Sequence, residues 1–144
     1  MDARGLDIRA AFREHGLRWT LRRERVYAAL AASGSHPTAD ALYELVGRQD
    51  TGLSLATVYN TLEALVKHGL ARRLSVGGGP QRFDADMSEH AHVTTPEGGI
   101  ADLPEDLSRA ILGSIDGSVL AEVERRLGVR VGGVRVEVEA RKGP

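Results

Sequence analysis

The residues best able to do chemistry in this sequence are histidines and carboxylates gathered around position 90. His90 and His92 are separated by one residue, so in a strand both imidazoles project to the same side and can reach one cation. His36 stands at the start of a predicted helix in the first half of the chain. The carboxylates near the pair are Asp84, Asp86, Glu89 and Asp102. Three imidazoles with two carboxylates suit Fe²⁺, Mn²⁺, Zn²⁺, Co²⁺ or Ni²⁺, so the pattern predicts a divalent metal site.

The chain contains no cysteine among its 144 residues. This excludes disulfides, thiolate nucleophiles and cysteine-ligated zinc or iron–sulfur sites, so nitrogen and oxygen atoms must hold any metal. Hydrophobic residues make up 42% and charged residues 27%, which excludes a mainly disordered chain. The longest stretch without Asp, Glu, Lys or Arg, residues 26–39, is shorter than the ~18 apolar residues of a membrane span. The N-terminal residues carry charges where a signal peptide needs an apolar core, so we expect a cytoplasmic protein with no membrane partner.

Short helices are predicted for the first half of the chain. Apolar residues recur at three and four positions over residues 22–32, and the polar, glycine-containing residues 33–35 end that helix. Pro37 and Thr38 are residues favoured at the start of a helix, and they predict a second helix that runs to Gly47. Ser54 caps a third, over residues 54–68, whose apolar side chains occupy about one third of its circumference before Gly69 ends it.

A β-hairpin is predicted after the third helix, with strands over residues 70–76 and 81–83 around the turn 77–80. Helices followed by a hairpin form a winged helix-turn-helix, in which the last helix enters the major groove of DNA. The polar face of helix 54–68 can meet bases and phosphates, although a polar face can also be merely solvated. Arginines flank this helix in the sequence and can bind phosphates. These are Arg18, Arg22, Arg23, Arg25, Arg72, Arg73 and Arg82.

The second half of the chain differs in pattern and in charge. A hairpin is predicted over residues 91–101, a helical region over 104–127 with interruptions near Gly113 and Gly117, and a strand over 129–140. These few elements are too small to bury a hydrophobic core by themselves, and pairing with a second copy of the chain would bury the remaining apolar surface. Residues 1–83 carry a net charge of +4 (12 basic, 8 acidic) and residues 84–144 a net charge of −5 (7 basic, 12 acidic). A basic half facing a polyanion and an acidic half with another role fit a two-part protein, although solvated surface explains such an asymmetry equally well.

Several segments together resemble the ferric uptake regulator family, whose members are dimeric, metal-dependent transcription factors. The matching segments are residues 36–40 (HPTAD), 54–62 (SLATVYNTL), 69–70 (GL), 82–84 (RFD) and 90–92 (HAH), followed by Asp102. The resemblance implies an α+β fold, with a winged-helix DNA-binding domain at residues 1–83 and a small α/β dimerisation and metal-sensing domain at 84–144. It also implies a homodimer that binds double-stranded operator DNA as a repressor and is not an enzyme.

The resemblance also assigns site residues. One regulatory divalent metal per subunit, Fe²⁺ or Mn²⁺ with Zn²⁺ as an alternative, would bind to a set of histidines and aspartates. This set is His36, Asp84, His90, His92 and Asp102. The loop after His92 is shorter than in relatives, so Glu105 or Asp106 is an alternative to Asp102. The implied DNA contacts are Arg18, Arg23, Thr57, Tyr59 and Asn60.

Two features qualify this assignment. Many members of the family hold a structural zinc with two Cys-x-x-Cys pairs, which this chain lacks, so we expect no structural zinc and a dimerisation domain held by packing alone. Aspartate at both Asp84 and Asp102 is similar to the peroxide-sensing branch, in which iron at this site oxidises a histidine ligand, here His36 or His90. Members without cysteine also include haem-responsive and manganese-responsive regulators.

Two other classes of protein compete with this interpretation. A small metalloenzyme would need an open coordination position beside an acid or base, and the sequence contains no nucleophile motif, no His-Glu-x-x-His and no phosphate loop. A winged-helix protein that has lost its dependence on metal would keep the same ligands without using them.

Overall fold

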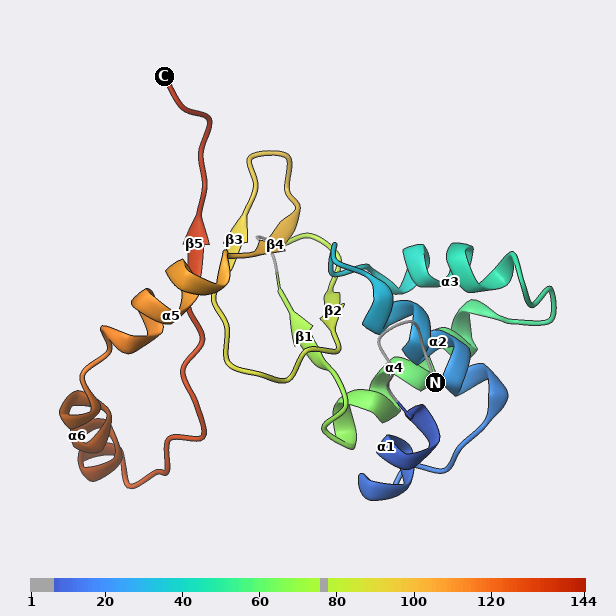
Figure 1. Cartoon of the computed structure of the whole chain (residues 1–144), viewed down its shortest axis with the longest axis horizontal. Coiled ribbons are helices and arrows are strands. Elements are labelled where there is room, and N and C mark those ends of the chain that lie inside the picture. Colours follow the sequence, from blue (N-terminus) through green and yellow to red (C-terminus); the bar gives the residue numbers. More distant parts are fainter. Residues whose placement is uncertain (1–6, 76–77) are drawn as a thin grey trace. The chain divides into compact units, whose positions relative to one another are not determined.

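Helices followed by a small antiparallel sheet make up the first part of the molecule (Figure 1). The computed structural model describes residues 7–75 and 78–144. Contacts divide the chain into two units, residues 1–87 and residues 88–144. The elements of the first unit are α1 (Ile8–Glu14), α2 (Leu21–Ala32), α3 (Ala39–Gly47), α4 (Leu55–Lys67), β1 (Arg72–Leu74) and β2 (Arg82–Asp84). Their order is that of the winged helix-turn-helix predicted from the sequence.

Helix α4 forms because its sequence supplies a cap at each end and an apolar face between them. The hydroxyl of Ser54 accepts a hydrogen bond from the backbone N–H of Thr57, which satisfies one of the free donors of the first turn. The helix ends where Gly69 adopts φ +73°, a conformation that favours glycine. Val58 and Leu62 are fully buried. The predicted helix over residues 54–68 is therefore confirmed.

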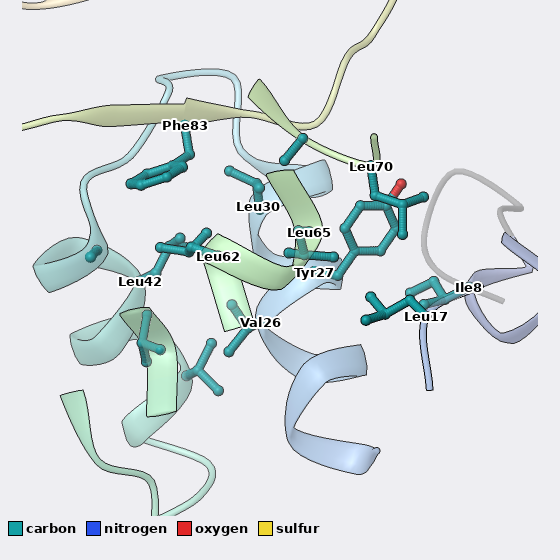
Figure 2. Packing of buried hydrophobic residues seen from close by; sticks show 14 of the residues in the cluster. Ile8, Leu17, Val26, Tyr27, Leu30, Leu42, Leu62, Leu65, Leu70 and Phe83 are labelled. Carbon is teal, nitrogen blue, oxygen red and sulfur yellow. The ribbon is translucent and has the colours of Figure 1, made fainter. Parts of the chain in front are cut away.

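The core of the first unit draws on all four helices and on β2 (Figure 2). Phe12 of α1 lies against Tyr27 of α2, with ring centroids 5.5 Å apart. Phe83 points from β2 into the cluster and is 2% exposed. Burying aromatic side chains of this size stabilises the unit by several kilocalories per mole each. Phe83 therefore anchors β2, and with it the neighbouring Asp84, to the helices.

The two strands of the first unit are shorter than the sequence predicts. β1 and β2 pair antiparallel, with Arg73 opposite Phe83. Strand pairing covers three residues of each segment, and β2 also pairs with the segment that precedes α3. Thr38 forms an isolated bridge with Arg82, and the N–H of Phe83 donates to the carbonyl of Pro37 at 3.1 Å. The predicted strand end at Val76 and the start of the turn at Gly77 lie outside the described residues.

The second unit combines a three-stranded sheet with two helices. Its elements are β3 (His92–Thr94), β4 (Ile100–Asp102), α5 (Glu105–Gly113), α6 (Gly117–Leu127) and β5 (Glu137–Glu139). The strand order is β4-β3-β5, with β4 antiparallel and β5 parallel to β3. In this register His92 lies opposite Asp102. The hairpin predicted over residues 91–101 is thus confirmed.

The predicted helical region and C-terminal strand differ in detail from the structure. The helix over residues 104–127 is interrupted after Gly113, and Asp116 caps α6 by accepting from the N–H of Ser118 at 2.9 Å. The predicted strand over residues 129–140 shortens to Glu137–Glu139, because β3 offers only three residues for pairing. None of the helices in the described part of the chain is long and apolar enough to cross a membrane.

Candidate metal and nucleic-acid sites

His36 and Asp84 are brought together by the pairing between the segment before α3 and strand β2. The Nδ1 atom of His36 lies 3.7 Å from Oδ1 of Asp84, and both side chains are almost fully buried. The guanidinium of Arg82 donates to the carbonyl of His36 at 3.2 Å, which fixes the backbone at this point. Two predicted metal ligands that are 48 positions apart in the sequence are therefore neighbours in the first unit.

The backbone of His36 is in a conformation that residues with a β-carbon adopt rarely. Its φ is +49°. Among the described residues, His36 is the single non-glycine residue whose φ is positive. Such a conformation costs about 1 kcal/mol or more and persists where the surrounding structure determines it. Here the bond from Arg82 and the adjacent strand pairing impose it. Strain at this position supports a functional role for the buried imidazole, because strained residues gather at functional sites.

A second set of predicted ligands lies within the second unit. Oδ1 of Asp102 is 3.1 Å from Nε2 of His90 and 3.3 Å from Nε2 of His92. The two imidazole rings are 4.4 Å apart between centroids and are inclined at 61°. The antiparallel pairing of β3 with β4 produces this arrangement, because it sets His92 directly opposite Asp102. Nitrogen and oxygen atoms suited to a cation thus face one point of the sheet.

The tautomer of His90 is set by its own loop. Nδ1 of His90 lies 2.8 Å from the carbonyl oxygen of Ser88. A carbonyl oxygen only accepts hydrogen bonds, so Nδ1 must carry the hydrogen. In the neutral ring the lone pair is then on Nε2, the atom that faces Asp102. Metal-binding histidines are commonly oriented through a hydrogen bond of this kind on the other ring nitrogen.

Asp102, rather than Glu105, lies beside the two histidines. Glu105 is in the exposed first turn of α5 and pairs with Arg109 at 2.5 Å. The residue before β3 is bonded to the same helix, because the buried hydroxyl of Ser108 accepts from the N–H of Ala91 at 2.6 Å. Asp106 is exposed in the same first turn as Glu105.

The five predicted metal ligands therefore form two sets, one within each unit. His36 and Asp84 belong to the first, and His90, His92 and Asp102 belong to the second. Imidazole nitrogens suit first-row transition metals, and carboxylate oxygens add negative charge and suit the harder members of that series. The chemistry of these donors, together with the burial of both members of the first set, fits a divalent metal such as Fe²⁺, Mn²⁺ or Zn²⁺.

Four of the five predicted DNA-contacting residues line one groove of the first unit. This groove has a volume of about 710 Å³ and lies between the start of α2 and the polar face of α4. The four are Arg18, Arg23, Thr57 and Asn60. The fifth, Tyr59, is 45% exposed on α4 and is not part of the groove lining within the described chain.

Local contacts position the basic residues of this groove. The guanidinium of Arg23 donates to the carbonyl of Arg18 at 2.7 Å, so one arginine holds the loop that carries the other. Thr20 caps α2 by accepting from the N–H of Arg23. The groove is also lined by Arg22 and Arg25, which the sequence indicates only as members of a run of arginines. Their spacing of three residues on one helix face is the signal that could have assigned them to it.

A model of the ferric uptake regulator family matches residues 14–114, a range that contains every predicted metal and DNA ligand. The chain belongs to this family. The resemblance noted from the sequence motifs is thereby confirmed.

Curated relatives include repressors named for their response to peroxide. The peroxide-responsive repressor PerR of Staphylococcus epidermidis is 34% identical over 84 residues, which cover 58% of this chain and 56% of the repressor. PerR of Staphylococcus aureus is 32% identical over 90 residues, covering 62% of this chain and 61% of the repressor. The chain thus spans about three-fifths of the length of the curated relatives that it matches.

Solved structures of regulators share the fold over nearly the whole chain. The peroxide stress regulator of Campylobacter jejuni superposes with a TM-score of 0.68 and 28% identity, covering 96% of this chain and 98% of that one. The ferric uptake regulator of Pseudomonas aeruginosa with manganese has a TM-score of 0.72 at 23% identity, covering 96% of this chain and 100% of that one. The second of these similarities concerns the fold alone.

Proposed function

We propose that this protein is a dimeric, metal-dependent transcriptional regulator that acts as a repressor in the cytoplasm and is not an enzyme. Membership of the ferric uptake regulator family supports this function, and so do the names of its relatives. The observation that carries the proposal is that each unit holds its own set of histidine and aspartate side chains, which strand pairing brings together.

One regulatory metal would be held by both sets together. His36 and Asp84 would contribute ligands from the DNA-binding unit, and His90, His92 and Asp102 would contribute them from the other unit. The bound ion would supply positive charge that draws the carboxylates and imidazoles of both units to one point. Fe²⁺ and Mn²⁺ are the metals we propose, with Zn²⁺ as the alternative, because all three accept this donor set.

Metal binding would control DNA binding by favouring one arrangement of the two units. When ligands from both units hold the same ion, the spacing between the two recognition helices of a dimer becomes fixed. Operator half-sites about one helical turn apart would then select that spacing. Moving the population from mostly open to mostly closed needs ~10⁴-fold tighter metal binding by the closed form, about 5.5 kcal/mol, which several added ligands can supply.

Operator DNA would be contacted by α4 and by the basic residues around it. Arg18 and Arg23 would bind phosphates or enter the minor groove, while Thr57, Tyr59 and Asn60 would face the major groove. The groove between α2 and α4 supports this proposal, because it gathers these arginines with the polar face of α4.

A second copy of the chain is the partner we propose for the second unit. Apolar side chains on α6 recur every fourth residue and face solvent, with Val119 58%, Val123 36% and Leu127 69% exposed. An amphipathic helix normally buries such a stripe, so an uncovered one marks an interaction surface. The same face recurs on each copy of a homodimer, which would cover it by symmetry.

The test of the metal site is a titration of His90→Ala with Mn²⁺. His90 faces Asp102 through Nε2, so its loss removes a ligand without disturbing the core of either unit. We expect metal-dependent DNA binding in a gel-shift titration to disappear while the dimer persists in light scattering. His68→Ala, which removes a histidine outside both sets, serves as the control for metal stoichiometry. If His90→Ala still responds to Mn²⁺, the assignment of this residue is wrong.

Peroxide is the signal we propose, with metal concentration or haem as the alternative signals. Aspartates at positions 84 and 102 and the peroxide-responsive relatives support it. The protein would be loaded anaerobically with Fe²⁺, treated briefly with peroxide and analysed by peptide mass spectrometry. An added oxygen on His36 or His90 would support peroxide sensing, whereas unmodified peptides with retained DNA binding would exclude it.

A further inference from the structure

An acidic residue, Asp50, lies among the arginines of the groove between α2 and α4. Among the described residues that line this groove, Asp50 is the single acidic one, and it lies with Arg18, Arg22, Arg23 and Arg25. A carboxylate at a surface meant for phosphates repels them, so its presence there calls for a reason.

Asp50 binds two of these arginines through one oxygen atom. Nε of Arg22 donates to Oδ2 of Asp50 at 3.0 Å, and Nη1 of Arg25 lies 3.5 Å from the same oxygen. The other oxygen, Oδ1, accepts from the N–H of Gly52 at 3.1 Å. The carboxylate is therefore held by the turn between α3 and α4 on one side and by α2 on the other.

The carboxylate is shielded, but its partners are not. The side chain of Asp50 is 14% exposed, whereas that of Arg22 is 46% and that of Arg25 is 37% exposed. Gly52 makes room for this arrangement, because a β-carbon there would come within 2.7 Å of the Arg22 guanidinium. Both arginines can thus meet a polyanion only from fixed positions and only against competition from Asp50.

Asp50 keeps its charge at neutral pH. The hydrogen bond from Arg22 lowers the pKa of this carboxyl below its usual value, and Asp50 in turn raises the pKa of Arg22. The ion pair is therefore present under the conditions in which DNA would bind.

We infer that Asp50 is a specificity-determining residue, which restrains Arg22 and Arg25 and so weakens binding to DNA of arbitrary sequence. This inference rests on the proposed DNA-binding function. On nonspecific DNA, phosphates must displace the carboxylate before either arginine can neutralise them. On an operator that fits the groove, restrained arginines keep their geometry and lose little conformational freedom. The ratio of operator affinity to nonspecific affinity therefore depends on Asp50.

The size of the effect follows from counterion release. Each phosphate newly neutralised changes the slope of log K against log[salt] by about −0.9. At ~0.1 M salt, one freed arginine corresponds to about an 8-fold gain in affinity for nonspecific duplex DNA, and one freed arginine in each subunit of a dimer corresponds to about a 60-fold gain. The gain on the operator is smaller, because there the arginine also loses its fixed position.

The experiment compares Asp50→Asn with the unchanged full-length protein, both loaded with Mn²⁺, by fluorescence anisotropy. One probe is a duplex that the unchanged protein enriches from a random pool, and the other is a scrambled duplex of equal length. We expect the Asp50→Asn dimer to bind the scrambled duplex about 60-fold tighter, with a steeper salt slope and a lower specificity ratio. The control Glu44→Gln removes the same charge from an exposed position on α3 and should change scrambled binding less than 2-fold.

Two further variants keep the inference open to refutation if Asp50→Asn is destabilised. Gly52→Ala displaces the Arg22 guanidinium without changing any charge, and it should also raise scrambled binding. The double variant Arg22→Gln/Asp50→Asn should bring the affinity for the scrambled duplex back toward that of the unchanged protein. Equal effects of Asp50→Asn and Glu44→Gln, or no gain in either single variant of this turn, would overturn the inference. If the unchanged protein enriches no duplex from the random pool, the proposed DNA-binding function itself fails.

Discussion

Two histidines outside the predicted metal site connect the end of helix α1 to the end of helix α4, the proposed recognition helix. Nδ1 of His15, at the C-terminus of α1, lies 2.9 Å from the carbonyl oxygen of His68, at the C-terminus of α4. Nδ1 of His68 lies 2.8 Å from the carbonyl oxygen of His15. Because carbonyl oxygens only accept, both rings donate, and the pair forms two reciprocal hydrogen bonds across 53 positions of sequence.

The geometry predicts an unusual result for a double-mutant cycle. Each ring binds the backbone of the other residue, so replacing one histidine by alanine leaves the acceptor for the other ring in place. Each bond should contribute about 1 kcal/mol to the free energy of unfolding, as intramolecular hydrogen bonds typically do. His15→Ala and His68→Ala should then each cost about 1 kcal/mol, and the double variant about 2 kcal/mol. The coupling energy should be within about 0.5 kcal/mol of zero although the residues are in contact.

The measurement is denaturant unfolding followed by the fluorescence of Trp19, the single tryptophan of the chain, which lies in the same unit. His15→Asn is the matched control, because its side-chain amide keeps an N–H donor close to the position of Nδ1 and should recover part of the loss. A coupling energy above about 1 kcal/mol would mean that the rings interact with each other, and the reasoning from two separate bonds would be refuted.

Two further predictions concern the core and the ion pair of the groove. Leu62→Ala removes a side chain of α4 that is fully buried and should cost about 3–5 kcal/mol in the free energy of unfolding, whereas Leu45→Ala, at a position 49% exposed on α3, should cost less than about 1 kcal/mol in the same denaturant titration. Because Arg22 lowers the folded-state pKa of Asp50, the ion pair stabilises the fold above the usual aspartate pKa of about 3.9 and loses this effect as the pH falls through the lowered value. The difference in stability between the unchanged protein and Asp50→Asn should therefore be constant from about pH 8 to pH 5 and shrink only in stronger acid; a difference that vanishes near neutrality would contradict this.

Local sequence patterns were sufficient to predict helices α2, α3 and α4 of the first unit. Ser54 and Gly69 mark the ends of α4 because capping and a left-handed backbone are properties of single residues. The hairpin of the second unit was predictable for a similar reason, since its turn follows from residues 96–98. Strand lengths were less predictable, because the length of β5 depends on how much of β3 is available to it.

The sequence by itself determined which residues can bind a metal, through their types, and which family the chain resembles, through the order of its motifs. Only the tertiary structure decided which of these residues are neighbours. Asp102 rather than Glu105 lies beside His90 because strand register sets it there. His36 reaches Asp84 because Thr38 pairs with Arg82 across 44 positions and Arg82 donates to the carbonyl of His36. The contact between Arg22 and Asp50 is likewise one that only the tertiary structure decided. Contacts between residues far apart in sequence depend on how elements pack, and no local pattern of residues records that packing.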